Sequence, residues 1–445
     1  MCCLKVIVFS ALIAVVRGER IFPDAFKFGA ATASYQVEGA WNVSDKSASI
    51  WDTFIHNKPS AIVDQSNGDV ACDSYHKWRE DVQLASELGL DFYRLSLSWP
   101  RLLPNGFSNY ISEDGKRYYN DIINGLLEKG IEPVITLYHW DLPQKLQDLG
   151  GWTNPLIVEW FADYARVVYD LFGDRIKSWI TINEPVIVCE ASYSFASFAP
   201  GIYSPGIGSY LCNKNVLLAH AKAWRLYDEE YKPKYGGKVS LTNQILWAQG
   251  HSEEYEDLAE LVLQMSAGLY SYPIFSKEGG WPPSVETYIA EKSAREGYTR
   301  SRLPPLTTEE IDFIKGTFDF YAVNYYTSRL VRNPKEGEKI GLWPLYGCEE
   351  LNALMEPAPE WPQTSSDWFF VYLAITEDNV NVTYYTAWTL LDNFEWSDGY
   401  VSKFGLVDVD FTHPDRPRTP RSSAYYYANV ISTRSLYDDD LKTNL

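Results

Sequence analysis

A closed α/β barrel is the architecture that this 445-residue sequence predicts. Strand-like runs alternate with helical patterns along nearly the whole chain, and this alternation is typical of a parallel sheet covered by helices. The number of repeating units favours closure of the sheet into a barrel. No low-complexity tract or Gly/Ser linker divides the chain, so we expect residues 19–445 to form a single domain.

The hydrophobic periodicity predicts the elements one after another. The expected strands are residues 26–33, 91–99, 131–138, 177–182, 238–247, 318–325 and 379–390. The expected helices are residues 75–88, 114–129, 155–172, 216–231, 254–270 and 422–431. In barrels of this kind the chemistry lies at the C-terminal ends of the strands, so the residues that follow each strand are the candidates for function.

The first 18 residues are typical of a secretory signal. Lys5 precedes the apolar run 6–16, and Gly18 offers a cleavage point before Glu19. The run is too short to span a bilayer, and no later segment reaches about 20 apolar residues. The sequence therefore predicts a secreted, extracellular protein without a membrane span.

Charge and cysteine content narrow the classes of partner. The net charge of −20 argues against a nucleic acid or an anionic membrane as partner. The four cysteines outside the signal are Cys72, Cys189, Cys212 and Cys348. Their spacing is not that of zinc ligands, and they are compatible with one or two disulfides or with free buried thiols.

Two N-glycosylation sequons occur in the chain. The first is Asn42-Val43-Ser44, in a polar loop, where we expect it to be accessible. The second is Asn381-Val382-Thr383, and we expect it to be unused because its β-branched run predicts a core strand.

Polar and aromatic side chains follow five of the predicted strands. One such residue is more often structural than functional, but five strand ends that meet at one barrel mouth favour a site. These candidates are Arg94, Ser96, Ser98, Trp99, His139, Trp140, Asn183, Glu184, Asn324, Tyr326, Trp388, Asp392, Asn393, Glu395 and Trp396.

Glu184 is the central candidate. The apolar run before it ends in Asn183, and Pro185 biases the Glu184 backbone toward an extended conformation. Hydrogen-bonding groups and indole rings around a carboxylate suit the hydroxyls and ring face of a sugar, as do the 16 Trp and 32 Tyr of the chain. We expect Glu184 to act as a general acid on a glycosidic oxygen, with its pKa raised by a nearby negative carboxylate.

Other chemistries lack their sequence signatures. The chain has no Gly-rich phosphate loop, no metal triad and no nucleophile elbow, so we expect neither a metal nor an organic cofactor.

Several motifs carry a family resemblance. They are residues 28–39 (FGAATASYQVEG), 181–185 (TINEP), 324–327 (NYYT) and 385–396 (YTAWTLLDNFEW). From about residue 21 to about residue 432, the chain resembles glycoside hydrolase family 1. Within that family it is most similar to animal secreted β-glucosidases, including the lactase-phlorizin and insect digestive types.

The resemblance implies a (β/α)₈ barrel and a retaining β-glycosidase that acts on small β-glycosides or oligosaccharides. Glu184 matches the acid/base residue of the family. The presence of this acid makes the plant thioglucosidase variant the poorer match. Sugar contacts are implied for Gln36, His139, Asn183, Glu395 and Trp396, with Trp388 as stacking floor and Phe404 at the entrance. We also expect Trp140 to bind the substrate. Arg94, Asn324 and Tyr326 match the groups that hold the nucleophile.

The family motif that supplies the nucleophile, Ile/Val-Thr-Glu-Asn-Gly on strand seven, has no counterpart here. Glu377 is the nearest candidate, but it lies only 18 residues before Glu395, which is too few for strand seven, a helix and strand eight. Residues 361–368 and 374–382 match family segments on either side of that strand. We therefore reject Glu377 and expect helix six, strand seven and most of helix seven to be missing around residues 369–373.

Such a loss leaves three interpretations of function. The chain is a retaining β-glucosidase as the family implies, a non-catalytic sugar-binding or receptor-like relative, or a splice form or gene model that lacks an exon. A seven-stranded barrel is expected to have an open seam, and Glu184 is expected to lose both its partner and the charge that raises its pKa.

Overall fold

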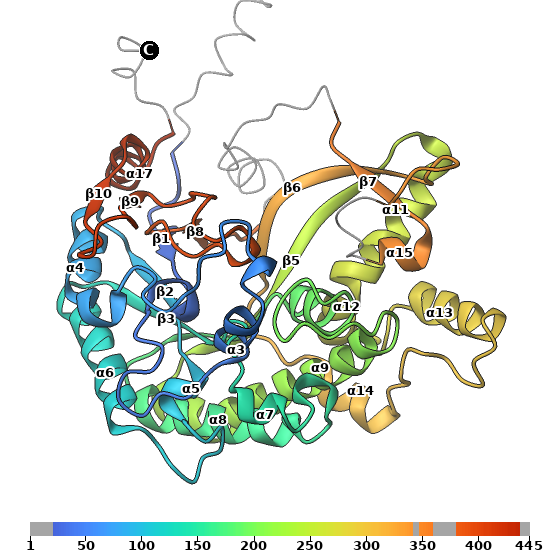
Figure 1. The fold of residues 1–445 in the computed structure, drawn as a ribbon, viewed down its shortest axis with the longest axis horizontal. Coiled ribbons are helices and arrows are strands. Elements are labelled where there is room, and N and C mark those ends of the chain that lie inside the picture. The colour runs from blue at the N-terminus through green and yellow to red at the C-terminus, as the bar shows by residue number, and fades with distance from the viewer. Residues whose placement is uncertain (1–20, 341–346, 359–379, 437–445) are drawn as a thin grey trace, which may run out of the picture.

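The computed structural model describes residues 21–340, 347–358 and 380–436, and it has the curled, mostly parallel sheet of a (β/α)₈ barrel (Figure 1). The hydrogen-bonded strand order is β7-β6-β5-β4-β3-β2-β1-β8. All neighbouring strands run parallel except β7, which pairs antiparallel with β6. The strands are β1 Lys27–Ala31, β2 Phe92–Ser96, β3 Glu132–Tyr138, β4 Ser178–Asn183, β5 Lys238–Gly250, β6 Ala322–Arg332, β7 Leu354–Glu356 and β8 Tyr384–Trp388.

The sheet is open on one side in the part of the chain that is described. β8 pairs with β1, and β6 pairs with β5 and β7, but no ladder joins β6 to β8 within the described ranges. The predicted seam falls between the same two strands. Glu377 and the junction around residues 369–373 lie outside the described residues, so the expectation of a missing strand stays a prediction.

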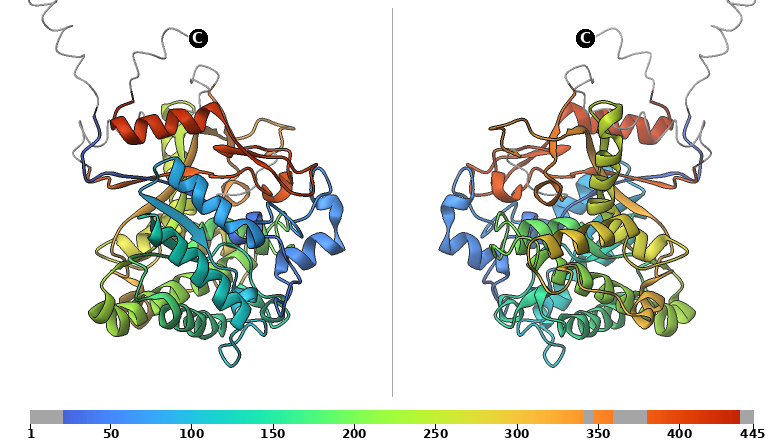
Figure 2. Two further views of the ribbon diagram at one scale, coloured as in Figure 1. Left: turned by 90° about the vertical axis from the view of Figure 1, so that its left-hand side faces the viewer. Right: turned by 90° about the vertical axis from the view of Figure 1, so that its right-hand side faces the viewer.

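Helices cover the outside of the sheet. The side views place the C-terminal helix α17 opposite the long helices α8 and α9 (Figure 2). The α-helices are α2 Ser34–Val37, α3 Ile50–Asn57, α4 Ser74–Glu87, α5 Trp99–Leu102, α6 Glu113–Glu128, α7 Gln144–Gln147, α8 Ile157–Phe172, α9 Gly208–Leu226, α10 Lys232–Tyr235, α11 Glu256–Leu263, α12 Leu269–Phe275, α13 Pro283–Arg295, α14 Thr308–Ile314, α15 Cys348–Leu351 and α17 Ser422–Thr433.

Shorter elements complete the fold. The 3₁₀ turns are Pro59–Ala61, Gly151–Thr153, Glu253–Tyr255 and Trp396–Asp398, and the π-helical segments are Ile187–Ala191, Tyr227–Tyr231 and Gln264–Gly268. A separate antiparallel pair is formed by β9 Val407–Val409 and β10 Arg418–Pro420.

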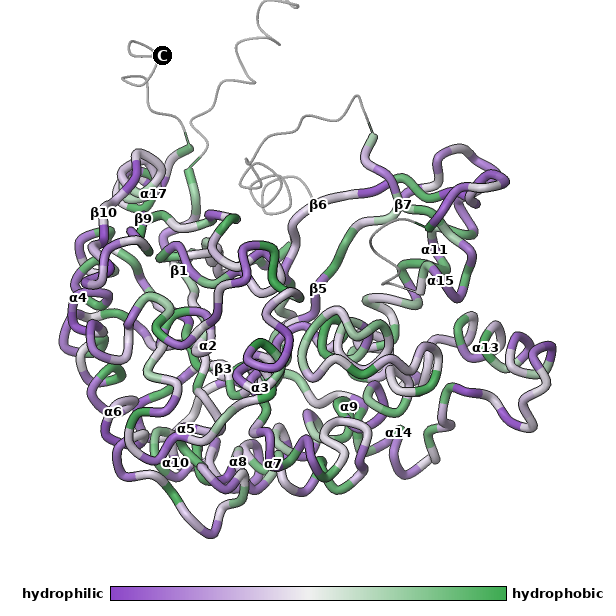
Figure 3. Tube along the Cα trace, viewed as in Figure 1, coloured by the Kyte–Doolittle hydropathy of each residue, from purple (hydrophilic) through white to green (hydrophobic). Residues whose placement is uncertain are grey.

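One continuous core joins the sheet to its helices. Strands β1 to β4 are buried along nearly their whole length, as expected when helices cover a parallel sheet, and Figure 3 colours much of β5 as hydrophobic. At the C-terminal end, the Tyr427 hydroxyl of α17 donates to the Gly29 carbonyl of β1 at 2.5 Å. The last helix therefore holds the first strand.

Most predicted elements are confirmed, with shifted ends. The helix expected at 216–231 begins eight residues earlier, at Gly208. The strand expected at 318–325 is wrong at its start, because β6 begins only at Ala322. The residues just before β6 do not pair as a strand. Instead, the Asp319 carboxylate accepts a 2.8 Å hydrogen bond from the Val239 N–H at the start of β5.

The last predicted strand is also shorter than expected. β8 covers only Tyr384–Trp388, and the Asn381 side chain before it is exposed rather than in a core strand. The interpretation of the second sequon as buried was therefore wrong.

The cysteines show both of the states that the sequence left open. Cys189 and Cys212 form a disulfide that links the segment after β4 to α9. Cys72 and Cys348 are free and buried. No helix in the described ranges is long and apolar enough to cross a membrane.

Candidate active site

Glu184 occupies the first position after β4. Its side chain is only 4% exposed, and its N–H donates to the Thr242 carbonyl of β5 at 2.8 Å. The φ angle of Glu184 is +49°, in the left-handed region, and a helical segment begins at Pro185. The expectation of an extended backbone was wrong, since a sharp turn between strand and helix needs this conformation.

Two neighbours set the electrostatics of Glu184. The Asn324 Nδ2 atom of β6 donates to the Glu184 Oε1 atom at 2.6 Å. Burial raises the pKa of Glu184 to about 7, although the Asn324 hydrogen bond and the nearby Arg94 guanidinium oppose that shift. A carboxyl with this pKa is largely protonated below neutral pH and can donate a proton.

The cause of that raised pKa differs from the predicted one. No carboxylate among the described residues contributes to the shift, because burial alone supplies the upward effect. A negative neighbour, the simplest cause that the sequence suggested, is therefore not required to raise the pKa of Glu184.

Asn183 connects three strands beside Glu184. Its Oδ1 atom accepts from Arg94 Nη2 at 2.6 Å and from Asn324 Nδ2 at 3.2 Å. Its carbonyl accepts from the Trp140 indole at 2.8 Å, and its Nδ2 atom donates to His139 Nε2 at 3.2 Å. This network fixes the residues that the sequence placed at separate strand ends.

His139 and Arg94 have distinct charge states. Burial and the nearby Arg94 hold the pKa of His139 well below its usual range, so the ring is neutral and its Nε2 atom can accept. Burial lowers the pKa of Arg94 to about 10, which still leaves the guanidinium charged near neutral pH. The Arg94 Nε atom also donates to Thr136 Oγ1 at 3.0 Å.

A second carboxyl group, Glu395, lies after β8. Its Oε2 atom accepts from Gln36 Nε2 at 3.4 Å, and its Oε1 atom accepts from the Trp388 indole at 3.2 Å. Burial raises the pKa of Glu395 to about 7 as well. Gln36, from α2, also donates to Asn393 Oδ1 and to the Phe394 carbonyl, both at 2.8 Å.

Aromatic rings join these two groups into one site. The His139 ring stacks on Trp388 and on Trp396, with ring centroids 5.9 and 6.0 Å apart. Trp140 packs against Trp396 at 4.5 Å. Side chains from the ends of β3, β4 and β8 and from the segment after β8 therefore lie next to one another, and their donors, acceptors and ring faces suit a hydroxylated ring.

Two predicted site residues, Tyr326 and Phe404, are largely exposed and lie at the edge of the site. The Tyr326 side chain is 47% exposed and lies close enough to Arg94 to affect its pKa. Phe404 is 53% exposed, and its carbonyl accepts from the Thr389 N–H, directly after Trp388, at 3.1 Å. Glu377 lies outside the described residues, so the structure does not test its rejection.

Thr136 is a contributor that was missed as a site residue in the sequence. It orients Arg94 by accepting a hydrogen bond from its Nε atom. No local signal marked it, because a buried threonine inside an apolar strand looks like an ordinary core residue. Asn393, which the sequence placed after the last strand, accepts a hydrogen bond from Gln36. No group of three or more His, Cys, Asp or Glu side chains in the described ranges could hold a metal ion.

The fold and this site define a carbohydrate-active α/β barrel with a buried acid at the end of its fourth strand. The chain belongs to glycosyl hydrolase family 1, whose model matches residues 18–377 and 370–436.

Known relatives agree with this assignment. A human protein named cytosolic beta-glucosidase is 40% identical over 464 aligned residues, which cover 93% of this chain and 99% of the relative. Because 93% of this chain is only about 414 residues, the alignment includes about 50 positions at which this chain has no residue.

Solved structures show the same fold. An aphid myrosinase superposes with a TM-score of 0.87 at 39% identity, over 93% of this chain and 100% of that one. A rice beta-glucosidase mutant, solved in a covalent complex with Glc, has a TM-score of 0.81 at 31% identity, over 94% and 98% of the two chains.

Proposed function

We propose that this chain is a secreted family member of the β-glucosidase type that binds the sugar of a β-glycoside, and that it carries only the acid half of a retaining catalytic pair. The observation that carries the proposal is the buried Glu184, which lies beside a set of sugar-compatible donors, acceptors and indoles. Gln36, His139, Asn183 and Glu395 are the proposed contacts to the sugar hydroxyls.

Retaining chemistry needs two carboxyl groups. In its first step the protonated acid donates to the glycosidic oxygen while a second carboxylate attacks the anomeric carbon and forms a glycosyl-enzyme. In the second step water releases the sugar, and the first group acts as base. Glu184 suits the first role because its pKa is about 7. The covalent complex of the rice relative supports this mechanism for the family.

Two comparisons support the absence of the second carboxylate from this chain. The family model matches the chain in two pieces that overlap at residues 370–377. The alignment to the human relative also includes about 50 positions with no residue here. We propose that the chain binds β-glucosides and does not hydrolyse them.

Secretion is supported by independent features. The first 18 residues have the pattern of a secretory signal, and the Cys189–Cys212 disulfide suits an oxidising compartment. Both sequon asparagines, Asn42 and Asn381, have exposed side chains.

Two measurements on the purified full chain test this proposal: glucose binding and hydrolysis of a β-glucoside. Tryptophan fluorescence should report saturable glucose binding, because three indoles surround the site, and Glu395→Gln should weaken that binding about 100-fold. Hydrolysis of 4-nitrophenyl β-glucoside should not exceed the rate in buffer. Failure to bind glucose would overturn the sugar-binding assignment. If the chain hydrolyses the substrate and Glu377→Gln abolishes that activity, the claim that the chain lacks a nucleophile is wrong.

A further inference from the structure

Asp141 is a buried carboxyl group that the proposed chemistry does not use. It follows His139 and Trp140 directly in the chain, and it is 1% exposed. Its Oδ2 atom accepts a 2.7 Å hydrogen bond from Ser34 Oγ. This bond connects the end of β3 to the first residue of α2, which lies 107 residues away in the sequence.

Ser34 is also hydrogen-bonded to β2, and it lies in the same short helix as Gln36. The Ser34 N–H donates to Ser96 Oγ at 2.7 Å, and Ser96 Oγ in turn donates to Ser34 Oγ at 3.0 Å. The residue before α2, Ala33, has no side chain that could cap the helix, so the Ser96 hydroxyl satisfies a helix N–H that has no partner within the helix. Gln36 lies two residues after Ser34 in this four-residue helix, and its position depends on how the helix is held.

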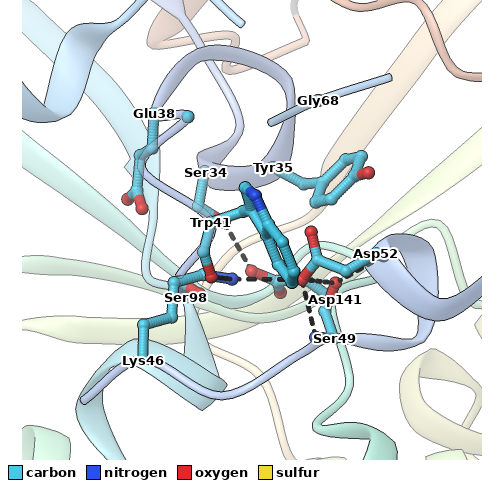
Figure 4. A pocket seen from close by; sticks show the side chains of 11 residues that line it. Ser34, Tyr35, Glu38, Trp41, Lys46, Ser49, Asp52, Gly68, Ser98 and Asp141 are labelled. Carbon is cyan, nitrogen blue, oxygen red and sulfur yellow. Dashed lines mark hydrogen bonds and ion pairs between the residues drawn. The ribbon is translucent and has the colours of Figure 1, made fainter. Parts of the chain in front are cut away.

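Figure 4 shows a small cavity beside Asp141, with Ser34, Asp52 and Lys46 on its walls. Its volume of about 10 Å³ suits about one water molecule. The Asp141 Oδ1 atom has no hydrogen-bond partner among the described residues. Glu38, Lys46 and Asp52 are the charged groups that line the cavity. Ser34 is therefore the group that holds the Asp141 side chain in its orientation.

We propose that Asp141 is a positioning residue for the sugar site: it fixes α2 against the end of β3, so that Gln36 and His139 face the same sugar. The proposal rests on the sugar-binding function for its main measurement. Buried polar groups with few partners specify one arrangement strongly, because any other arrangement leaves them without hydrogen bonds in a medium of low polarity. No direct contact between Asp141 and the sugar is involved.

Glucose binding of four variants in the full chain tests the proposal. Asp141→Ala and Ser34→Ala should each weaken glucose binding about tenfold, since each removes one partner of a buried hydrogen bond. The double variant should be no weaker than about tenfold, because both changes break the same connection. Asp141→Asn should bind within about threefold of the unsubstituted chain, since the amide oxygen still accepts from Ser34.

Tyr270→Phe is the matched control. It removes another buried hydrogen bond, from the Tyr270 hydroxyl to Asn213 Oδ1 at 2.5 Å, away from the sugar site. It should cost similar stability without a change in glucose affinity. Equal losses of affinity in Tyr270→Phe and Asp141→Ala, or additive losses in the double variant, would overturn the proposal.

Hydrogen exchange supplies a readout that does not need sugar. In Asp141→Ala the α2 amides of Gln36 and Val37, which donate to the Ala33 carbonyl, should exchange about tenfold faster, whereas Tyr270→Phe should leave them unchanged. Unchanged exchange in Asp141→Ala overturns the positioning role. If the unsubstituted chain does not bind glucose, the sugar-binding function fails and hydrogen exchange alone decides this proposal.

Discussion

Asn324, on β6, donates a 2.6 Å hydrogen bond to the Glu184 carboxyl group at the end of β4, 140 residues earlier in the sequence. β5 lies between these two strands in the sheet, so the bond spans two strand neighbours at the barrel mouth. It favours the ionised form of Glu184, whereas burial favours the protonated form. The acid strength of Glu184 therefore results from opposing effects, and substitution of Asn324 isolates the effect of this hydrogen bond.

Asn324→Ala should raise the pKa of Glu184 above its value of about 7, by about one unit, because the ionised carboxylate loses a donor. Infrared or carbon-13 NMR titration of the Glu184 carboxyl group measures this shift. Asn215→Ala, which removes a buried amide that donates to the Trp152 carbonyl, should leave the titration unchanged. A lower pKa in Asn324→Ala would contradict the electrostatic account.

Glu184→Gln should change how stability depends on pH. The folded-state pKa of about 7 lies above the ordinary value of 4.5, so the folded chain holds this proton more tightly than the unfolded chain. The stabilising effect is complete below pH 4.5 and is lost as pH rises through 7. Since glutamine does not ionise, the variant should gain on the order of 3 kcal/mol relative to the parent between pH 4.5 and pH 8.

Urea unfolding at several pH values measures that gain. Glu128→Gln, on the exposed side of α6, serves as control and should show no such pH-dependent difference. A Glu184→Gln variant whose relative stability does not vary with pH would show that burial does not raise the acid's pKa.

Gln36→Ala should abolish most sugar affinity, with glucose binding weakened about 100-fold. The Gln36 side chain donates to Asn393, to the Phe394 carbonyl and to Glu395, so its loss also frees the Glu395 carboxyl group to reorient. Calorimetric titration with glucose measures the effect. Gln83→Ala, which alters an exposed amide on α4, should bind glucose like the parent. If Gln36→Ala binds glucose as tightly as the unsubstituted chain, Gln36 does not contact the sugar and the proposed site is wrong.

Sequence periodicity predicted the barrel because the buried strands carry continuous apolar runs that end abruptly in polar residues. The β4 run into Asn183 and Glu184 is one example, and the sequence correctly placed these two residues beside His139 and Asn324. Motif resemblance also brought Gln36 and Glu395 together although 359 residues separate them.

Other features depend on tertiary structure and could not be read from local pattern. The left-handed backbone of Glu184 is set by its strand-to-helix turn, and its pKa is set by burial rather than by a neighbouring carboxylate. The start of β6 was misplaced because residues 318–321 look like a strand, yet Asp319 binds the start of β5. Asn381 was expected to be buried because a β-branched run does not show where pairing begins.

Expression in insect cells should deliver the chain to the medium with glycans on both sequons. The Asn42 and Asn381 side chains are exposed, and secreted chains carry glycans at accessible sequons. Enzymatic removal of N-glycans should lower the mass in two steps, and Asn42→Gln and Asn381→Gln should each remove one step. Retention of unglycosylated chain inside the cells would contradict secretion.

The central claim is that Glu184 is present without a nucleophile in a chain that still binds sugar. A β-glucoside with a good leaving group and fluorine at C2 slows release of the glycosyl-enzyme, so a retaining enzyme becomes covalently labelled. Intact-mass spectrometry of the glucose-binding chain after incubation with this reagent tests the claim most directly. We predict no increase in mass, whereas one added fluoroglucosyl group, mapped to Glu377 or any other carboxylate, would contradict it.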